Sequence, residues 1–326
     1  MPDDQSAPPE QQSGRGRHAE RPTDLPAPGW KDIAWRVYGD ISEKNLFLAA
    51  GGVTYAVLLA LFPGLAALVS VYGLVSNPNQ IQQQVASMSG MLPEQTRQMI
   101  SSELHSLAAS SSGALGIGLV ISVLLALWSA SRGMSGLMSA VNLAYGERET
   151  RSFLRFNGVA LVLTIGAIVG GVVAIGLVGG LPAAVQAAGF GTFLNWLMLI
   201  LEWPLLFGLM LVGLAVLYRY APDRDEPQWR WVSPGAIVAT ALWIVGSICF
   251  SVYVGNFGSY NKTYGSLGGA VVLMTWLYLT AVVVLLGAAV NAQAERQTRK
   301  DTTKGQPQPM GTRDAKAADT LGESHR

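Results

Sequence analysis

The sequence contains little that could support redox, metal or hydrolytic chemistry. Among its 326 residues there is one cysteine, Cys249, and there are three histidines, His18, His105 and His325. A single cysteine inside an apolar run excludes a disulfide framework and a thiolate metal site, and the histidines show no paired spacing for a metal. A Walker-type phosphate-binding loop is also missing, which argues against ATP hydrolysis. We therefore expect no cofactor, no bound metal and no enzymatic activity.

Charge is scarce as well, at 13% of the residues, whereas 50% are hydrophobic. The mean hydropathy of +0.33 is too high for a chain of this length that dissolves in water. A bilayer core of about 30 Å requires about 20 mostly apolar residues per helix. Six runs satisfy this requirement, at residues 46–75, 114–144, 154–180, 193–218, 232–254 and 266–294. The sequence predicts an all-α fold, a polytopic membrane bundle of six transmembrane helices.

The two ends of the chain have no apolar run. Residues 1–29 and 297–326 are rich in polar and charged side chains. Such segments cannot bury enough apolar surface to offset the entropy lost on ordering, so we expect them to be disordered tails. The membrane domain is then expected at residues 30–296.

A short amphipathic segment precedes the first apolar run. Between Trp30 and Lys44, helical spacing places Ile33 and Val37 on one face and charged residues such as Asp32 on the other. A helix with this pattern typically lies in the membrane interface. We predict an interfacial helix leading into the first span.

Lysine and arginine are distributed unevenly among the connections. Six precede the first run, three follow the second, three follow the fourth and seven follow the sixth, so these segments hold 19 of the 22. The other connections carry only Arg97 and Lys262. Because cytoplasmic loops retain lysine and arginine, this bias predicts that both termini are cytoplasmic.

The first and third runs contain residues that affect helix geometry. Pro63 and Gly64 interrupt the first run, and because proline removes a backbone donor, we expect a kink that serves either movement or packing alone. Two pairs of glycines four positions apart in the third run favour close helix packing: Gly166 with Gly170, and Gly176 with Gly180.

Glu202 is the one acidic residue in the fourth run. A carboxylate within the bilayer would mark a proton or cation path. However, Pro204 favours a helix start just after Glu202, which would leave the carboxylate at the outer interface beside Trp203. We favour the interfacial position.

Arg132 is the one basic residue inside the second run. If the run is helical from its first residue, Arg132 lies about 27 Å along it, near the inner edge of the hydrocarbon. In one interpretation the guanidinium snorkels to the headgroups, and residues 134–141 continue as a helix near that interface. In the other, small neighbours such as Ser129 and Ser131 admit another helix, and Arg132 points inward to bind an anionic headgroup. Both interpretations remain open.

A polar turn separates the last two runs. Residues 255–269 read GNFGSYNKTYGSLGG, which is compatible with a re-entrant turn lining a polar cavity and equally with a tight loop carrying interfacial tyrosines. Together with Tyr55 of the first run, its polar side chains are candidate substrate contacts: Asn256, Asn261, Lys262 and Tyr264.

Four segments resemble the YihY/BrkB-like family of bacterial inner-membrane proteins. They are YAVLLALFP at Tyr55–Pro63, LWSASRGMSGLMSAVNLAYG at Leu127–Gly146, LYRYAPDR at Leu217–Arg224, and the long block at Pro234–Ala292. One departure stands out, since the family leads us to expect an acidic residue where this chain has Gly287-Ala288-Ala289. The resemblance implies a bacterial inner-membrane location and six helices.

The resemblance also brings conflicting functional labels. Members have been called ribonuclease BN and serum-resistance protein, and others look connected with lipid or envelope-precursor transport. A ribonuclease needs metal ligands or an acid–base pair and a cationic surface for phosphates. This sequence offers neither, so no nucleic-acid partner is expected. We predict a transporter or flippase-like protein with membrane lipids as partners, carrying an anionic lipid or a lipid-linked precursor. The alternative is a non-transporting structural protein of the cell envelope.

Overall fold

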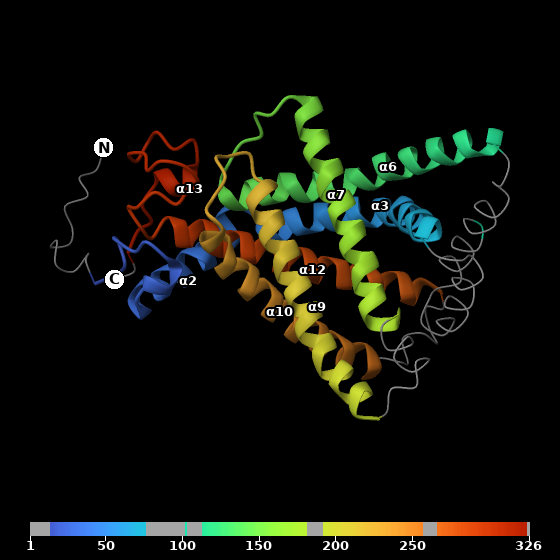
Figure 1. Ribbon diagram of the computed structural model, residues 1–326. Coiled ribbons are helices and arrows are strands. Elements are labelled where there is room, and N and C mark those ends of the chain that lie inside the picture. Colours follow the sequence, from blue (N-terminus) through green and yellow to red (C-terminus); the bar gives the residue numbers. More distant parts are fainter. Residues whose placement is uncertain (1–13, 76–101, 103–112, 181–191, 257–265, 325–326) are drawn as a thin grey trace.

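The computed structural model describes residues 14–75, 102, 113–180, 192–256 and 266–324 (Figure 1). In these ranges the chain is helical apart from its connections, and the strand-like pairing found there is a single bridge between Pro227 and Thr303. The all-α prediction is confirmed.

Six long helices coincide closely with the six apolar runs. They are α3 (Leu46–Val75), α6 (Gly113–Tyr145), α7 (Phe153–Ile175), α9 (Thr192–Tyr220), α10 (Trp229–Asn256) and α12 (Ser266–Glu295). The shorter elements are η1 (Pro22–Asp24), α2 (Ala27–Glu43), the π-helical turn η2 (Gly176–Gly180) that extends α7, and α13 (Lys316–Asp319).

Length and hydropathy identify candidate membrane spans among the described residues. Four stretches qualify: Phe153–Val178, Leu201–Tyr220, Trp229–Gly255 and Gly269–Glu295. Helix α2 and the part of α3 up to Leu61 form a pair bent by 65°, and counting that pair as one broken span raises the number to five. The six-span count and the cytoplasmic termini stay predictions.

Helix α12 lies at the centre of the bundle and packs against α10, α3, α6 and α2. Its crossing with α10 is very close, because a Cβ added at Gly287 would lie 2.7 Å from the Gly235 carbonyl oxygen and 2.8 Å from the Ala239 methyl group. Helices α3 and α6 also meet through small residues. A Cβ at Gly136 would lie 2.9 Å from that of Ala56. Small side chains therefore set the helix spacing in this part of the bundle.

The glycines of α7 behave differently from what their spacing predicts. Helix α7 packs against α6 and α9, but nothing lies within 4 Å of the Cβ positions of Gly166, Gly170 and Gly176. Its buried face carries Ala160, Thr164 and Ile168 instead. The expectation that these glycines mediate close packing is wrong within the described chain.

Three prolines lie inside long helices: Pro63, Pro204 and Pro234. Helix α3 continues through Pro63 and Gly64, and α9 continues through Pro204 from a start at Thr192. The predicted helix start just after Glu202 is therefore wrong. Glu202 and Pro204 both lie in the interior of α9, and the interfacial position of Glu202 stays a prediction.

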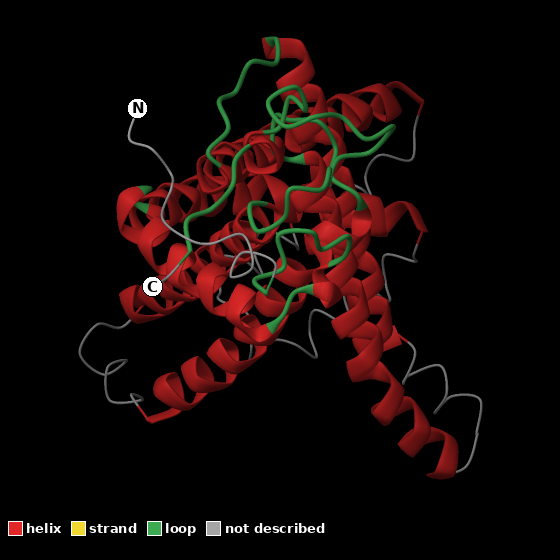
Figure 2. Ribbon diagram, turned by 90° about the vertical axis from the view of Figure 1, so that its left-hand side faces the viewer, coloured by secondary structure: helices red, strands yellow, loops and turns green. Residues whose placement is uncertain are grey.

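Both terminal segments are packed where the structure describes them, which corrects the expectation of disordered tails. The Thr298 hydroxyl donates to the Ala19 carbonyl at 2.7 Å, and the Arg299 amide donates to the Arg17 carbonyl at 2.9 Å. Figure 2 looks onto this end of the molecule, where the connections run across the helix ends. The physical reason is that polar contacts replace the missing apolar surface, and composition does not reveal such contacts.

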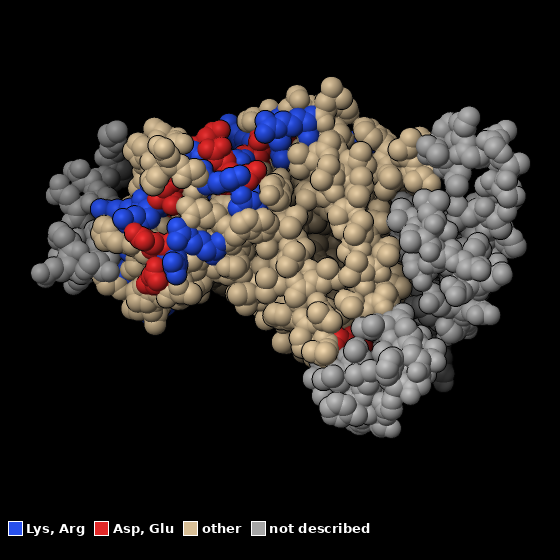
Figure 3. All heavy atoms as spheres, in the orientation of Figure 1, with Lys and Arg blue, Asp and Glu red and all other residues tan. Residues whose placement is uncertain are grey.

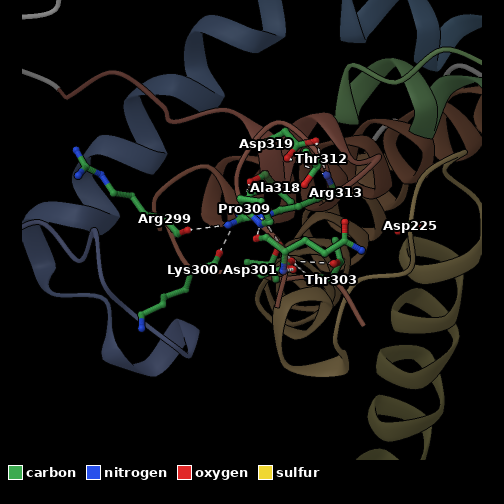
Figure 4. Close-up of polar contacts among 12 residues, drawn as sticks. Asp225, Arg299, Lys300, Asp301, Thr303, Pro309, Thr312, Arg313, Ala318 and Asp319 are labelled. Atoms are coloured by element: carbon green, nitrogen blue, oxygen red, sulfur yellow. Dashed lines mark hydrogen bonds and ion pairs between the residues drawn. The ribbon is translucent and has the colours of Figure 1, made fainter. Parts of the chain in front are cut away.

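Arg313 holds the C-terminal segment, residues 297–324, in a compact fold (Figure 4). Its buried guanidinium donates to the carbonyl groups of Ala318 at 2.7 Å, Arg299 at 2.9 Å and Gln308 at 3.0 Å. The Asp301 carboxylate lies 3.8 Å away. A single side chain thus ties several turns of the segment together.

Helix α2 buries charged residues as well as apolar ones. Asp32, Arg36 and Asp40 are buried, whereas Trp35 and Tyr38 are 48% and 75% exposed. The apolar residues Ile33 and Val37 are buried as predicted, but the prediction that the charged residues lie on the opposite, outer face is wrong. The reason lies in α12, whose last turn offers amide partners for the charges.

Candidate functional site at the polar end of the bundle

Charged side chains gather at one end of the molecule (Figure 3). They cover α2, α13 and the connections that precede α7 and α10, while the rest of the visible described surface carries few charges. A surface divided in this way suits a protein with an apolar body in the bilayer and one end in water. We call this region the polar end.

A buried ion pair forms the core of the polar end. Arg224 donates from both terminal nitrogens to the Glu295 carboxylate, at 2.9 and 2.7 Å, and both side chains are 0% exposed. The Thr302 hydroxyl donates to the same carboxylate at 2.6 Å. Burial alone would lower the pKa of Arg224, but the Glu295 charge outweighs it and raises that pKa. This pair joins the α9–α10 connection, α12 and the C-terminal segment.

A second cluster joins the α6–α7 and α9–α10 connections. The Thr150 hydroxyl donates to the Asp223 carboxylate at 2.7 Å, and Arg151 lies 3.6 Å from it. The Asp223 amide donates to the Asn142 side chain at 2.7 Å. Burial would raise the pKa of Asp223, but the hydrogen bonds from Thr150 and the Arg151 charge lower it below its ordinary value. The carboxylate is thus held ionised.

The same region holds Arg36 of α2 against α12. Its guanidinium donates to the side-chain oxygens of Gln293 at 2.8 Å and Gln297 at 2.6 Å. Burial lowers the pKa of Arg36 to about 10, with a further lowering from the Arg17 charge. The guanidinium remains charged at neutral pH and is fixed by amides.

A cavity of about 680 Å³ opens between these connections and the C-terminal segment. Most of its lining residues are charged or polar: Gly146, Glu147, Arg148, Thr150, Arg151, Ser152, Arg155, Asp223, Arg224, Asp225, Asp314 and Lys316. We refer to it as the polar-end cavity.

Arg132 lies on the outer surface of α6, next to the start of α7. Its guanidinium is 3.4 Å from the Asn157 side-chain oxygen and 4.9 Å from the centre of the Trp128 ring. Ser129 is exposed, and Ser131 is buried with its hydroxyl donating to the Trp128 carbonyl at 2.7 Å. Arg132 is itself exposed rather than enclosed by other helices of this chain.

The continuation of α6 beyond Arg132 corrects one expectation. Met138 and Val141 are 0% exposed and belong to the core, so this stretch does not lie along the interface. Tyr145, the last residue of α6, is also fully buried and packs under the Arg224 guanidinium at 5.3 Å. The end of α6 therefore supports the polar end from within.

The other predicted contacts are not gathered around Arg132. Tyr55 is 64% exposed on α3. Asn256 is the last residue of α10, and its side chain lies outside the described part. Asn261, Lys262 and Tyr264 fall outside the described residues altogether.

Sequence reasoning missed Glu295, Arg224, Asp223 and Asn157. One signal was present, because Glu295 is the one acidic residue in α12 and follows Gly287-Ala288-Ala289, where an acid was expected. A carboxylate that is buried at the end of an apolar helix needs a paired cation, because an unpaired buried charge is strongly destabilising. Which arginine supplies that cation depends on the tertiary fold and does not follow from the sequence.

Neither cluster resembles a metal centre. In the part of the chain that the structure describes, His, Cys, Asp and Glu do not form a group of three or more that could hold a metal ion. The ion pairs described above instead connect segments that are far apart in the sequence. The arrangement is that of an integral, multi-pass α-helical membrane protein whose charged connections interlock at one end.

Comparison with known proteins agrees with this class. The family described as "Virulence factor BrkB" matches residues 37–311, and the chain belongs to this family. A relative from Bacillus subtilis (strain 168), named "Putative ribonuclease-like protein YfkH", is 31% identical over 253 residues, which is 76% of this chain and 89% of the relative.

Other relatives carry a membrane-protein name. A "UPF0761 membrane protein" from Tolumonas auensis is 29% identical over 269 residues, covering 81% of this chain and 85% of that protein. One from Pseudoalteromonas translucida is 25% identical over 282 residues, covering 84% and 89%. No solved structure matches the chain.

Proposed function

We propose that this protein is a transporter or flippase-like protein of the bacterial inner membrane that moves an anionic lipid or a lipid-linked envelope precursor. The observation that supports this proposal is the exposed guanidinium of Arg132 on an otherwise apolar helix face. Leu124, Leu125 and Trp128 precede it on α6 and are 59%, 62% and 42% exposed. These side chains face lipid if α6 crosses the bilayer.

A guanidinium in such surroundings needs an anionic partner. It carries five N–H donors, and the contact with Asn157 at 3.4 Å uses one of them. Charged groups at membrane depth are costly unless they are paired or reach the interface. A lipid phosphate supplies the missing charge and matches the planar fork of donors. Arg132 is therefore the proposed first contact of the transported headgroup.

The packing of α7 supports movement beside this contact. Its glycines have no close neighbours in the described chain, and the surface is hollowed between α7 and α9 (Figure 3). A helix held by few close contacts can shift at a lower energetic cost than one locked by backbone contacts. A headgroup bound at Arg132 would then pass along the α7 side of the bundle.

A ribonuclease function finds less support. The relative named "ribonuclease-like" carries that word in its name. In this chain, among the described residues, no metal-binding group of acids, histidines or cysteine is present. A structural envelope protein that binds lipid without moving it is the remaining alternative, and a flux measurement separates it from a transporter.

The test is lipid flux in proteoliposomes. Fluorescent phosphatidylglycerol and phosphatidylcholine are each included in the vesicles, and a membrane-impermeant quencher reports how fast inner-leaflet label reaches the outer leaflet. We expect the parent protein to accelerate phosphatidylglycerol movement more than phosphatidylcholine movement. Arg132→Gln should abolish the difference, and Arg132→Lys should reduce it because lysine lacks the planar fork.

Arg230→Gln is the matched control, because Arg230 is also exposed and its side chain bonds only to Gln228 among the described residues. It should leave flux unchanged. If both Arg132 variants move phosphatidylglycerol like the parent, Arg132 is not the headgroup contact. If the parent moves neither lipid, the structural alternative is favoured.

A further inference from the structure

The polar-end cavity has the size and the chemistry of a headgroup site. Its volume of about 680 Å³ falls within the range of roughly 300–1,000 Å³ that is typical of small-molecule sites. Three separate segments form its walls: the α6–α7 connection, the α9–α10 connection and the C-terminal segment. The ion pairs described above fix these walls relative to one another.

Two of the arginines lining the cavity have no acidic partner among the described residues. Arg224 is bound by Glu295, and Arg151 is bound by Glu149 at 2.7 Å. The Lys316 charge acts on the Glu147 carboxylate, which accepts a hydrogen bond from the Lys316 amide at 2.7 Å. By contrast, the side chains of Arg148 and Arg155 make no ion pair with any described residue, and both are exposed. These free positive charges attract a negatively charged group.

Helix α7 begins at the wall of this cavity. Ser152 is its N-cap, and the Ser152 hydroxyl accepts from the Arg155 amide at 3.4 Å. The amides of the first helical turn, including those of Phe153 and Leu154, have no partner within the helix. They add a partial positive charge beside the free arginines, and such an arrangement favours a phosphate.

Acidic side chains give the cavity a second kind of polar group. Asp225 and Asp314 line it, and neither carboxylate forms an ion pair among the described residues. Carboxylates accept hydrogen bonds from hydroxyl groups. The cavity can therefore hold a phosphate at the α7 side and hydroxyl groups at the side formed by Asp225 and Asp314.

The rim of the cavity indicates a lipid rather than a free phosphate ester. Phe153 and Leu154 directly follow the lining residue Ser152 and are 65% and 83% exposed. Exposed apolar side chains next to free cations match the boundary between acyl chains and headgroups. We propose that the polar-end cavity binds the headgroup of an anionic phospholipid that carries hydroxyl groups, such as a glycerol or sugar phosphate headgroup.

This assignment rests on the proposed function and specifies its ligand. Asn157, whose side chain accepts a hydrogen bond from the Arg132 guanidinium, lies in the second turn of α7. Arg155 lies in the first turn. Both contacts therefore occur at the same end of one helix. The two proposed headgroup contacts are therefore connected through the first two turns of α7.

The test is direct binding to the purified full-length protein in detergent. Short-chain phosphatidylglycerol is the main probe, with short-chain phosphatidylcholine, glycerol 3-phosphate and inorganic phosphate as separate arms. The double variant Arg148→Gln/Arg155→Gln should weaken phosphatidylglycerol binding by roughly 10- to 100-fold, the effect of losing charged hydrogen-bond partners. The other three probes should bind at least about 10-fold more weakly than phosphatidylglycerol.

A matched double variant controls for bulk charge. Arg230→Gln/Lys304→Gln also removes two exposed cations from the polar end, but neither residue lines the cavity. It should bind phosphatidylglycerol like the parent, and all variants should share the parent's unfolding temperature. Equal loss in both double variants, unchanged binding in the cavity variant, or equal binding of free glycerol phosphate would each overturn the assignment.

The outcome also separates the two proposals. If the cavity variant loses phosphatidylglycerol binding while the parent shows no lipid flux, the cavity assignment stands and transport is wrong. If flux depends on Arg132 but binding does not depend on Arg148 and Arg155, transport stands and the cavity assignment is wrong.

Discussion

Glycines occur both at the crossing of α10 and α12 and on the exposed face of α7. They differ in how closely atoms of other helices approach them. At the crossing, backbone and side-chain atoms of the neighbouring helix already occupy the space that a Cβ would need at Gly235 or Gly287. On α7 the corresponding space at Gly166 and Gly170 is empty. The crossing is tightly packed, and we call it the locked region. The face of α7 has no close neighbours, and we call it the open region.

This difference extends to the rest of each region. The locked part continues into the polar end, where the Tyr218 hydroxyl donates to the Val284 carbonyl at 2.8 Å and Arg224 pairs with Glu295. The open part carries exposed apolar residues such as Val162, Val169 and Val173, which are 68%, 51% and 45% exposed. We infer that the locked region provides the scaffold and that α7 is the element free to move.

The largest expected effect is the loss of the buried ion pair. Glu295→Ala leaves the Arg224 guanidinium buried without its counter-charge, which costs about 3–5 kcal/mol. We expect a strongly lowered unfolding temperature in detergent. The double variant Arg224→Met/Glu295→Met removes both charges and should recover most of that loss. If Glu295→Ala unfolds at the parent's temperature, the polar end is not the scaffold.

A smaller effect should distinguish the two sets of glycines. Gly287→Val places side-chain atoms against Gly235 and Ala239, so we expect a destabilisation of about 1–3 kcal/mol from overpacking. Gly170→Val has empty space around it and should unfold within about 0.5 kcal/mol of the parent. Thermal unfolding of both variants under the same conditions provides the measurement. Equal losses would show that α7 is as tightly packed as the crossing.

The smallest predicted effect concerns pH and the C-terminal segment. Burial would raise the pKa of Asp301, but hydrogen bonds from the Gln308 and Thr303 amides and the Arg313 charge lower it below its ordinary value of 3.8. A lowered pKa stabilises the folded segment above pH 3.8, and this stabilisation is lost as the pH falls through the folded value.

Protection of residues 300–319 against hydrogen exchange, relative to an unstructured chain at the same pH, should therefore fall on acidification before that of α12 does. In Asp301→Asn this acid-dependent loss of protection should disappear, because the titrating group is gone. Protection that falls equally in the parent and in Asp301→Asn would contradict the role given to this carboxylate.

The helices can be predicted from the sequence because each depends on the composition of its own segment. Each long helix is an apolar run that must satisfy its own backbone hydrogen bonds in lipid, so its approximate limits follow from composition. The start of α9 does not follow from Pro204, because a proline is common at the first helical position but this helix tolerates it in its interior. The terminal segments were misjudged because their order depends on Arg313 and distant carbonyl groups.

The candidate site was only partly predictable for the same reason. Arg132 could be singled out because a cation in an apolar run is unusual, but its partner Asn157 is on another helix. The polar-end cavity is formed by three segments, at residues 146–155, 223–225 and 314–316, that lie far apart in the sequence. No periodicity or spacing brings such segments together, so the cavity becomes visible only in the fold.

The most direct measurement of the central claim is the lipid that remains bound to the purified protein. Native mass spectrometry of the parent, released from detergent after addition of equal phosphatidylglycerol and phosphatidylcholine, should show preferential retention of phosphatidylglycerol. Arg132→Gln should retain clearly less of it, while Arg230→Gln should match the parent. Equal retention of both lipids by the parent, or unchanged retention in Arg132→Gln, would contradict the account of Arg132 as the contact for an anionic headgroup.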